Sequence, residues 1–169
     1  MNLIEFVEKA KKLKPGEYPT KDLIQKYQIT IKKEFLDIVR KWKKQNFDNH
    51  WRSDNNQMKT GKLIKLVEEV TKGMEYHYRE FWPNKEIEVV TKVDHYCMFF
   101  SPNKSKIRIG FDTKNPSIIS TLHELGHAFL GFNELKACVF SQAIFTKVFP
   151  NQFNKLVWEG HMLKKCQKK

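Results

Sequence analysis

Apolar residues recur every three or four positions along the first half of the chain. Three segments carry this helical spacing: residues 3–13, the segment from Thr30 to Trp42, and Leu63 through Phe81. Between the second and third segments, residues 46–59 are polar and aperiodic, which is typical of a loop. The pattern therefore predicts an all-helical first half.

The period of the pattern changes at Pro83. After it, Glu86–Lys92, His95–Phe100 and Lys106–Phe111 alternate between polar residues and β-branched or aromatic residues, which indicates short strands. A Ser-Pro-Asn turn signal at 101–103 separates the last two strands. We predict a small antiparallel sheet from these segments.

Helical spacing returns after the predicted sheet. Asn115 followed by Pro116 is a typical helix start, and the helix is expected to run to about Leu130. Gly131 can then take the positive φ that often ends a helix.

Two more helices are expected after this one. Asn133 can cap a helix that runs to about Val148, and Pro150 would end it. Apolar positions between Phe153 and Leu163 predict a last helix.

The order of these elements predicts an α+β fold. Residues 1–82 are expected to form a helical scaffold or annex, and residues 83–169 a core that holds the sheet and the remaining helices. With 169 residues, of which 40% are hydrophobic, the chain can form one compact unit.

The helix expected to end at Leu130 contains His123-Glu124-Leu125-Gly126-His127, which is an H-E-x-x-H pattern. Two histidines four residues apart lie on one helical face, so both imidazoles can reach a single cation. Glu124 can then take a proton from a water on that cation and pass it to the leaving amine. The pattern predicts one zinc ion per chain and hydrolysis of peptide bonds.

A catalytic zinc ion usually has three protein ligands and an open fourth position. Glu134 is our first choice for the third ligand, because the turn after His127 would fold the next helix back against the first. Glu159 and His161 compete with it if the last helix packs over the site.

With these residues the chain resembles the zincin metallopeptidases of the gluzincin type, most closely the small ImmA/IrrE-type metallopeptidases. The resemblance covers roughly residues 86–148. It rests on Lys106–Ile109 as the strand before the helix, on the H-E-x-x-H pattern, and on Glu134–Ala137 at the start of the next helix. A SprT-like, DNA-associated protease is a weaker second resemblance.

The resemblance implies an α+β core in which His123, His127 and Glu134 bind zinc and Glu124 is the catalytic residue. It also implies proteolysis, often of a DNA-bound repressor, and sometimes a link to phage or mobile-element regulation.

By the same resemblance, His95–Phe100 would be the outer strand, which pairs with an extended substrate, and Lys106–Phe111 the inner one. His95, Tyr96 and His161 are candidates for stabilising the transition state, and the sequence does not rank them.

Composition adds a second functional hypothesis. The chain has 31 Lys and Arg against 19 Asp and Glu, a formal net charge of +12. The excess is spread, with 19 basic and 12 acidic residues in 1–85 and 12 and 7 in 86–169. This charge permits nucleic-acid binding without requiring it. The alternative function is therefore a basic nucleic-acid-binding or regulatory protein with a structural or vestigial zinc site.

A helix-turn-helix would fit this alternative, and the segment from Thr20 to Trp42 could pass for one. The segment lacks a Gly turn and a cluster of base-reading Arg or Gln residues. A helical scaffold is the better interpretation of this segment.

The remaining composition bears on location. Three cysteines without C-x-x-C spacing argue against a disulfide framework, so we expect a reducing cytoplasm. No apolar run is long enough for a membrane helix, and no membrane partner is expected. Richness in Lys, Asn, Ile and Phe is typical of an AT-rich bacterial, phage or viral genome, and a phage or viral protein would act in the host cytoplasm.

Overall fold

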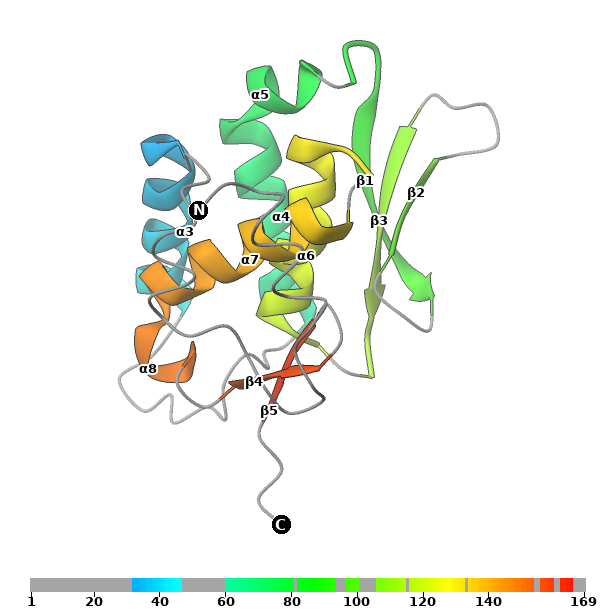
Figure 1. The fold of residues 1–169 in the computed structure, drawn as a ribbon. Coiled ribbons are helices and arrows are strands. Elements are labelled where there is room, and N and C mark those ends of the chain that lie inside the picture. Colours follow the sequence, from blue (N-terminus) through cyan, green and yellow to red (C-terminus); the bar gives the residue numbers. More distant parts are fainter. Residues whose placement is uncertain are drawn as a thin grey trace.

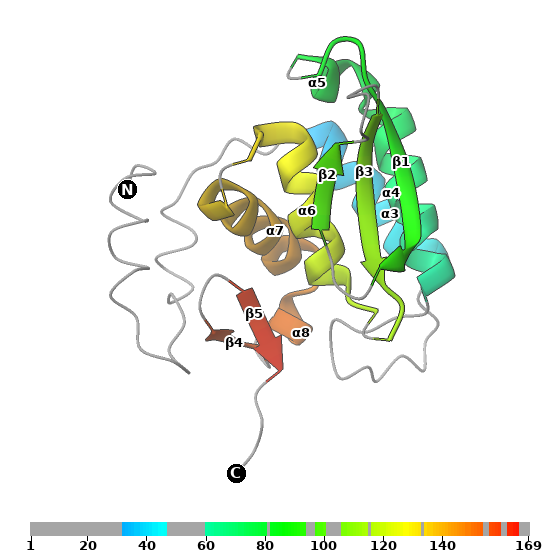
Figure 2. The ribbon, with the colours of Figure 1, turned by 90° about the vertical axis from the view of Figure 1, so that its right-hand side faces the viewer.

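The computed structural model places helices against one face of a three-stranded sheet, followed by a two-stranded hairpin (Figures 1 and 2). The α+β class is confirmed, and most of the ordered elements are helical. The predicted helix at 3–13 and the candidate helix-turn-helix up to residue 31 lie outside the described residues. The structure describes residues 32–46, 60–80, 82–93, 97–100, 106–114, 116–132, 134–153, 156–159 and 162–165.

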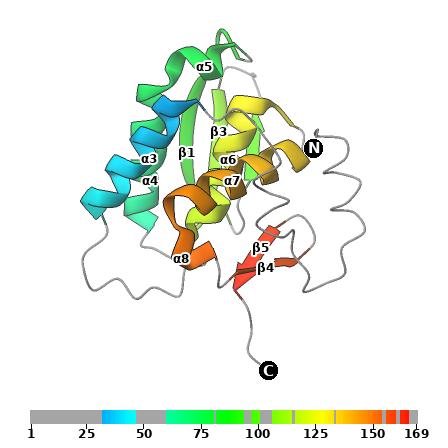
Figure 3. The ribbon, with the colours of Figure 1, turned by 60° about the vertical axis from the view of Figure 1, so that its left-hand side comes forward.

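Helices α3 (Lys33–Asn46) and α4 (Thr60–Gly73) lie side by side (Figure 3) and bury the apolar stripes that predicted them. Trp42 of α3 is fully buried, and its indole N–H donates a hydrogen bond to the carbonyl of Lys62 at 3.1 Å. This bond fixes the end of α3 beside the beginning of α4.

The single helix predicted over Leu63–Phe81 is wrong in one respect, because the chain divides there into two helices. α4 ends at Gly73, and α5 covers Glu75–Arg79. Met74 between them leaves helical geometry, with φ −121° and ψ 22°. Met74 is nevertheless buried, so the apolar spacing continues through the break and could not reveal it.

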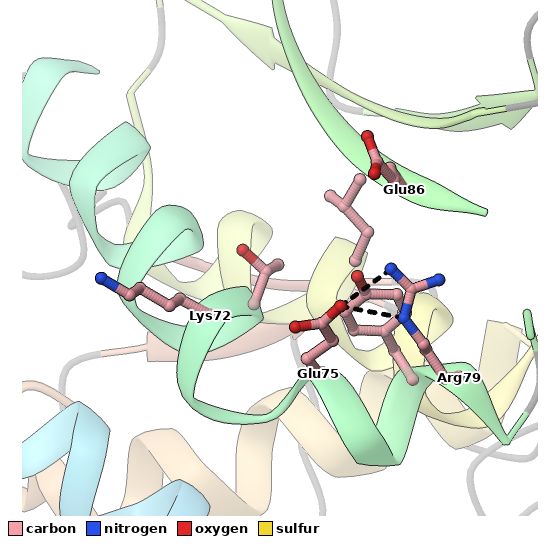
Figure 4. A pocket seen from close by; sticks show the side chains of 7 residues that line it. Lys72, Glu75, Arg79 and Glu86 are labelled. Atoms are coloured by element: carbon pink, nitrogen blue, oxygen red, sulfur yellow. Dashed lines mark hydrogen bonds and ion pairs between the residues drawn. The ribbon is translucent and has the colours of Figure 1, made fainter. Parts of the chain in front are cut away.

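A shallow polar pocket of about 280 Å³ lies between α5 and the start of the sheet (Figure 4). Arg79, at its edge, forms an ion pair with Glu75 at 2.8 Å. The same guanidinium donates hydrogen bonds to the carbonyls of Pro83 and Lys85. Arg79 therefore serves as a structural junction that ties α5 to the turn before the first strand.

The sheet has the strand order β1-β3-β2, with β3 (Lys106–Asp112) in the centre. β2 (Cys97–Phe100) pairs antiparallel with β3, as predicted, but β1 (Glu86–Val93) runs parallel to β3. The prediction of a wholly antiparallel sheet is thus wrong. The 12 residues between β1 and β3, which include β2, are long enough for a parallel connection. Alternation of polar and apolar residues is the same in both pairings, so the sequence could not distinguish them.

The two faces of β3 differ in character. Ile107, Ile109 and Phe111 are fully buried, whereas Arg108 between them donates a hydrogen bond to Glu88 of β1 at 3.1 Å. Lys106 lies 3.8 Å from the same carboxylate. These ion pairs link the two parallel strands on the face away from the buried residues.

Helix α6 (Ile118–Leu130) follows the sheet. It begins with Ser117 as its N-cap, whose hydroxyl accepts a hydrogen bond from the N–H of Ser120, and not at Asn115 and Pro116 as predicted. With Ser117 as the cap, the N–H of Ser120 is one of the first-turn donors that have no partner within the helix, and the Ser117 hydroxyl satisfies it.

Helix α7 (Glu134–Val148) confirms the next predicted helix, and α8 (Pro150–Phe153) confirms the break at Pro150. Pro150 itself opens α8, which is the helical position that proline favours.

The last predicted helix, from Phe153 to Leu163, is wrong beyond the end of α8. Strands β4 (Leu156–Glu159) and β5 (Met162–Lys165) form an antiparallel hairpin there. Two residues connect them, of which the first is Gly160. A two-residue connection with glycine between apolar runs is a hairpin signal. Here it outweighs the helical spacing, which predicted a helix.

One apolar core joins the helices and the sheet. The ring of Phe35 from α3 lies edge-on to Phe129 of α6 and Phe140 of α7, with centroid distances of 5.3 and 5.0 Å. The same cluster includes buried residues of α4 and β3. Within the described part of the chain, no helix has the length and apolar character needed to cross a membrane.

Candidate metal centre

Helix α6 carries the H-E-x-x-H pattern in a position that is buried almost all round. From Ile118 to Phe129, every residue except Ser120 is buried. His123, Glu124 and His127 have exposed fractions of only 3%, 5% and 4%. Ionisable side chains are rarely so buried unless a partner or a function keeps them there. These three residues therefore form the candidate site.

The two imidazoles lie close together on one face of α6. The rings of His123 and His127 lie one turn apart, with centroids 4.9 Å apart and planes at 87°. Nδ1 of His127 is 2.9 Å from the carbonyl oxygen of Gly131. Because a carbonyl can only accept a hydrogen bond, Nδ1 is the donor, and in a neutral imidazole this leaves the lone pair on Nε2. A backbone carbonyl orients metal-binding histidines in this way in many proteins.

Gly131 holds His127 from two sides. Its N–H donates to the carbonyl of His127 at 2.9 Å, while its own carbonyl accepts from the ring. The residue has φ 82° and ψ −165°, a region that is essentially restricted to glycine. The sequence predicted the positive φ, but it gave no signal that the carbonyl would turn back to the imidazole.

A second contact that the sequence did not reveal supports the same helical turn. The indole N–H of Trp82 donates to the carbonyl of Ala128 at 3.0 Å, and the Trp82 ring lies edge-on to Phe132 at 5.4 Å. The last turn of α6, which carries His127, is thereby tied to the segment before β1.

Helices α6 and α7 approach each other closely at Gly126. A Cβ atom at this position would lie 3.0 Å from the Cα atom and 3.1 Å from the carbonyl oxygen of Ala137. Glycine therefore permits the contact between the two backbones. Glu134, the predicted third ligand, opens α7 three residues before Ala137. Its backbone thus lies about one helical turn from this contact, and its side chain is outside the described part.

The structure describes little of the other candidate site residues. Glu159 ends β4, but its side chain is not among the described ones. His161, His95 and Tyr96 lie outside the described residues. Within the described side chains, no group of three or more His, Cys, Asp or Glu residues could hold a metal ion. The third ligand therefore stays a prediction.

The two described histidines are ligands of a kind that zinc binds. Zinc prefers imidazole nitrogen and carboxylate oxygen ligands, and His123 and His127 supply two imidazoles from one helical face. The neighbouring residues of the helix are apolar, with Leu122 and Leu125 fully buried. Such a shell limits access of water to an ion.

The edge strand β2 lies beside this helix. β2 contacts α6, and in the three-stranded sheet its outer edge pairs with no other described strand (Figure 2). The predicted position of the outer strand is thereby confirmed for Cys97–Phe100.

Comparisons with protein-family models, with curated proteins and with solved structures found no match for this chain. The function must therefore be inferred from the chain's own residues and geometry.

Proposed function

We propose that this protein is a zinc-dependent endopeptidase of the gluzincin type. The observation that carries the proposal is the buried pair His123 and His127, with ring centroids 4.9 Å apart and Glu124 buried beside them on the same helix. An imidazole pair oriented through His127 Nδ1, with a carboxylate next to it, matches the needs of metal-assisted hydrolysis.

Each residue has a distinct role in this proposal. His123, His127 and Glu134 hold the ion. When bound, zinc lowers the pKa of a water molecule and polarises the scissile carbonyl. Glu124 takes the proton of the water and gives it to the leaving amine. With 5% exposure, the Glu124 carboxylate is shielded from bulk water, which limits proton exchange between these two steps.

The edge of β2 supports a binding mode for the substrate. An extended peptide can add to an open sheet edge through its backbone, and β2 presents such an edge next to α6. The family resemblance adds that the substrate is a regulatory or DNA-associated protein.

The zinc content of the purified chain tests the proposal. After mild dialysis, elemental analysis is expected to find one zinc per chain in the wild type and none in His123→Ala or Glu134→Ala. Glu68→Ala, at an exposed position of α4, is the control and keeps the ion. Loss in His123→Ala alone would move the third ligand to Glu159 or His161. A wild type that stays without zinc after reconstitution would contradict the proposal.

Replacement of Gly131 by alanine is expected to weaken zinc binding by about 10- to 100-fold. An alanine side chain disfavours the φ of 82°, so the carbonyl that orients His127 would move. Competition with a chelator of known affinity measures the change. Gly61→Ala is the matched control, because nothing lies within 4 Å of a Cβ at Gly61. Equal zinc affinity in the two variants would show that the Gly131 carbonyl does not orient the ligand.

A further inference from the structure

Where α3 ends and α4 begins, the described residues carry positive charge and include no acidic side chain. Arg40–Asn46, at the end of α3, and Thr60–Val67, at the beginning of α4, together hold six Lys or Arg and no Asp or Glu. The two stretches are neighbours in space, because Lys62 Nζ donates to the carbonyl of Asn46 at 2.8 Å (Figure 3).

Most of these cations face solvent. Lys43 is the exception, since its ammonium donates to the carbonyl of Val148 and lies 4.9 Å over the ring of Phe149. The other five are exposed, and we call them the basic surface: Arg40, Lys41, Lys44, Lys62 and Lys65.

Acidic neighbours neutralise this surface only in part. Arg40 lies 3.9 Å from Asp37, and Lys65 lies 4.0 Å from Glu69, in exposed pairs that contribute little. Lys41 and Lys44 form no ion pair with a described carboxylate. Two lysines of the basic surface therefore have no described counterion.

Ordinary helix electrostatics do not explain the arrangement. Cations near the end of α3 complement the helix dipole, but Lys62 and Lys65 stand near the beginning of α4, where the dipole disfavours them. Like charges at a spacing of three or four residues, such as Arg40 and Lys44, also repel each other. The opposite ends of the same helices mix both signs, as an ordinary solvated face does, with Glu34 and Asp37 on α3 and Glu68 and Glu69 on α4.

We propose that the basic surface binds the phosphate backbone of double-stranded nucleic acid without reading its sequence. Exposed basic side chains at neighbouring helix ends can contact successive phosphates, and binding releases the counterions of those phosphates. A membrane surface fits less well, because binding to lipid needs exposed apolar side chains beside the cations. The exposed large apolar residues of the described chain are Tyr76 and Phe132, and neither belongs to the basic surface.

The location separates this activity from the candidate metal centre. α4 contacts β1, which lies at the edge of the sheet opposite β2, and α3 lies on the side of the helices away from the sheet (Figure 1). Nucleic acid on the basic surface would therefore leave the edge of β2 open, and the proposal does not depend on peptidase activity.

Fluorescence anisotropy with a short DNA duplex tests the proposal on the full chain. For the wild type, the logarithm of affinity should fall linearly with the logarithm of salt concentration between about 50 and 200 mM. The double variant Lys41→Gln, Lys44→Gln should reduce that slope by about 2 and weaken binding by roughly 50-fold at about 0.1 M salt. The control Lys72→Gln, Lys114→Gln removes the same charge from exposed positions outside the basic surface and should leave both quantities nearly unchanged.

Two results would overturn the proposal: equal losses in the two double variants, and no duplex binding by the wild type at about 50 mM salt. In the second case, binding to phosphatidylserine vesicles would assign the basic surface to a membrane instead. Thermal unfolding checks that each variant is folded. If the first pair lowers the melting temperature, Arg40→Gln, Lys65→Gln repeats the test on the same surface and carries the same expectation.

Discussion

Glu124→Gln is expected to keep one zinc ion per chain and to lower peptidase turnover by about 10³-fold. The amide has nearly the same shape as the carboxylate, so His123 and His127 stay in place, but it cannot accept the proton of the attacking water. Turnover of an unfolded protein substrate or a peptide library, measured beside zinc content, separates the two effects. Glu68→Gln, at an exposed position on α4, is the matched control.

The outcomes of this experiment distinguish three roles for Glu124. Lost turnover with retained zinc supports a role as general base and acid. Lost zinc would make Glu124 a metal ligand, and unchanged turnover would remove it from the mechanism altogether.

Gly126→Val is expected to lower the free energy of unfolding by about 2 to 3 kcal/mol. The new side chain would meet the α7 backbone at Ala137, where even a Cβ would lie 3.0 Å from the Cα atom. Backbone atoms cannot move aside as the end of a flexible side chain can, so the two helices must separate. Glu134 begins α7, and zinc affinity should therefore fall together with stability.

Chemical denaturation of the full chain measures this loss of stability. Gly61→Val is the matched control, because Gly61 also lies in a helix but a Cβ atom there would meet no other atom within 4 Å. The control should change stability by no more than about 0.5 kcal/mol. Equal stabilities of the two variants would show that α7 can shift away from Gly126 without cost.

The two proposals assign different sides of the molecule to different chemistry. The candidate metal centre lies in α6 beside the edge strand β2, and the basic surface lies on α3 and α4, of which α4 contacts β1 at the opposite edge of the sheet. A peptidase built in this way could hold nucleic acid and a DNA-associated substrate at the same time. The zinc and duplex-binding measurements test the two sites separately.

The sequence by itself determined the helices that bury one apolar stripe. The spacing of Phe35, Val39 and Trp42 specifies the buried face of α3, and all three are buried as expected. It also determined that His123, Glu124 and His127 share one helix, because residues within a few positions of one another are fixed by helical geometry alone. Local periodicity is enough for these features.

Tertiary structure decided which elements pair. β1 lies parallel to β3, and β4 pairs with β5 where helical spacing predicted a helix. It also decided that the carbonyl of Gly131 meets His127 and that Gly126 lies against Ala137. Strand direction and helix contacts depend on segments distant in sequence, and their free energies arise only when those segments meet. The pattern of apolar and polar residues indicates which face of a helix or strand is buried, but not which other element packs against that face.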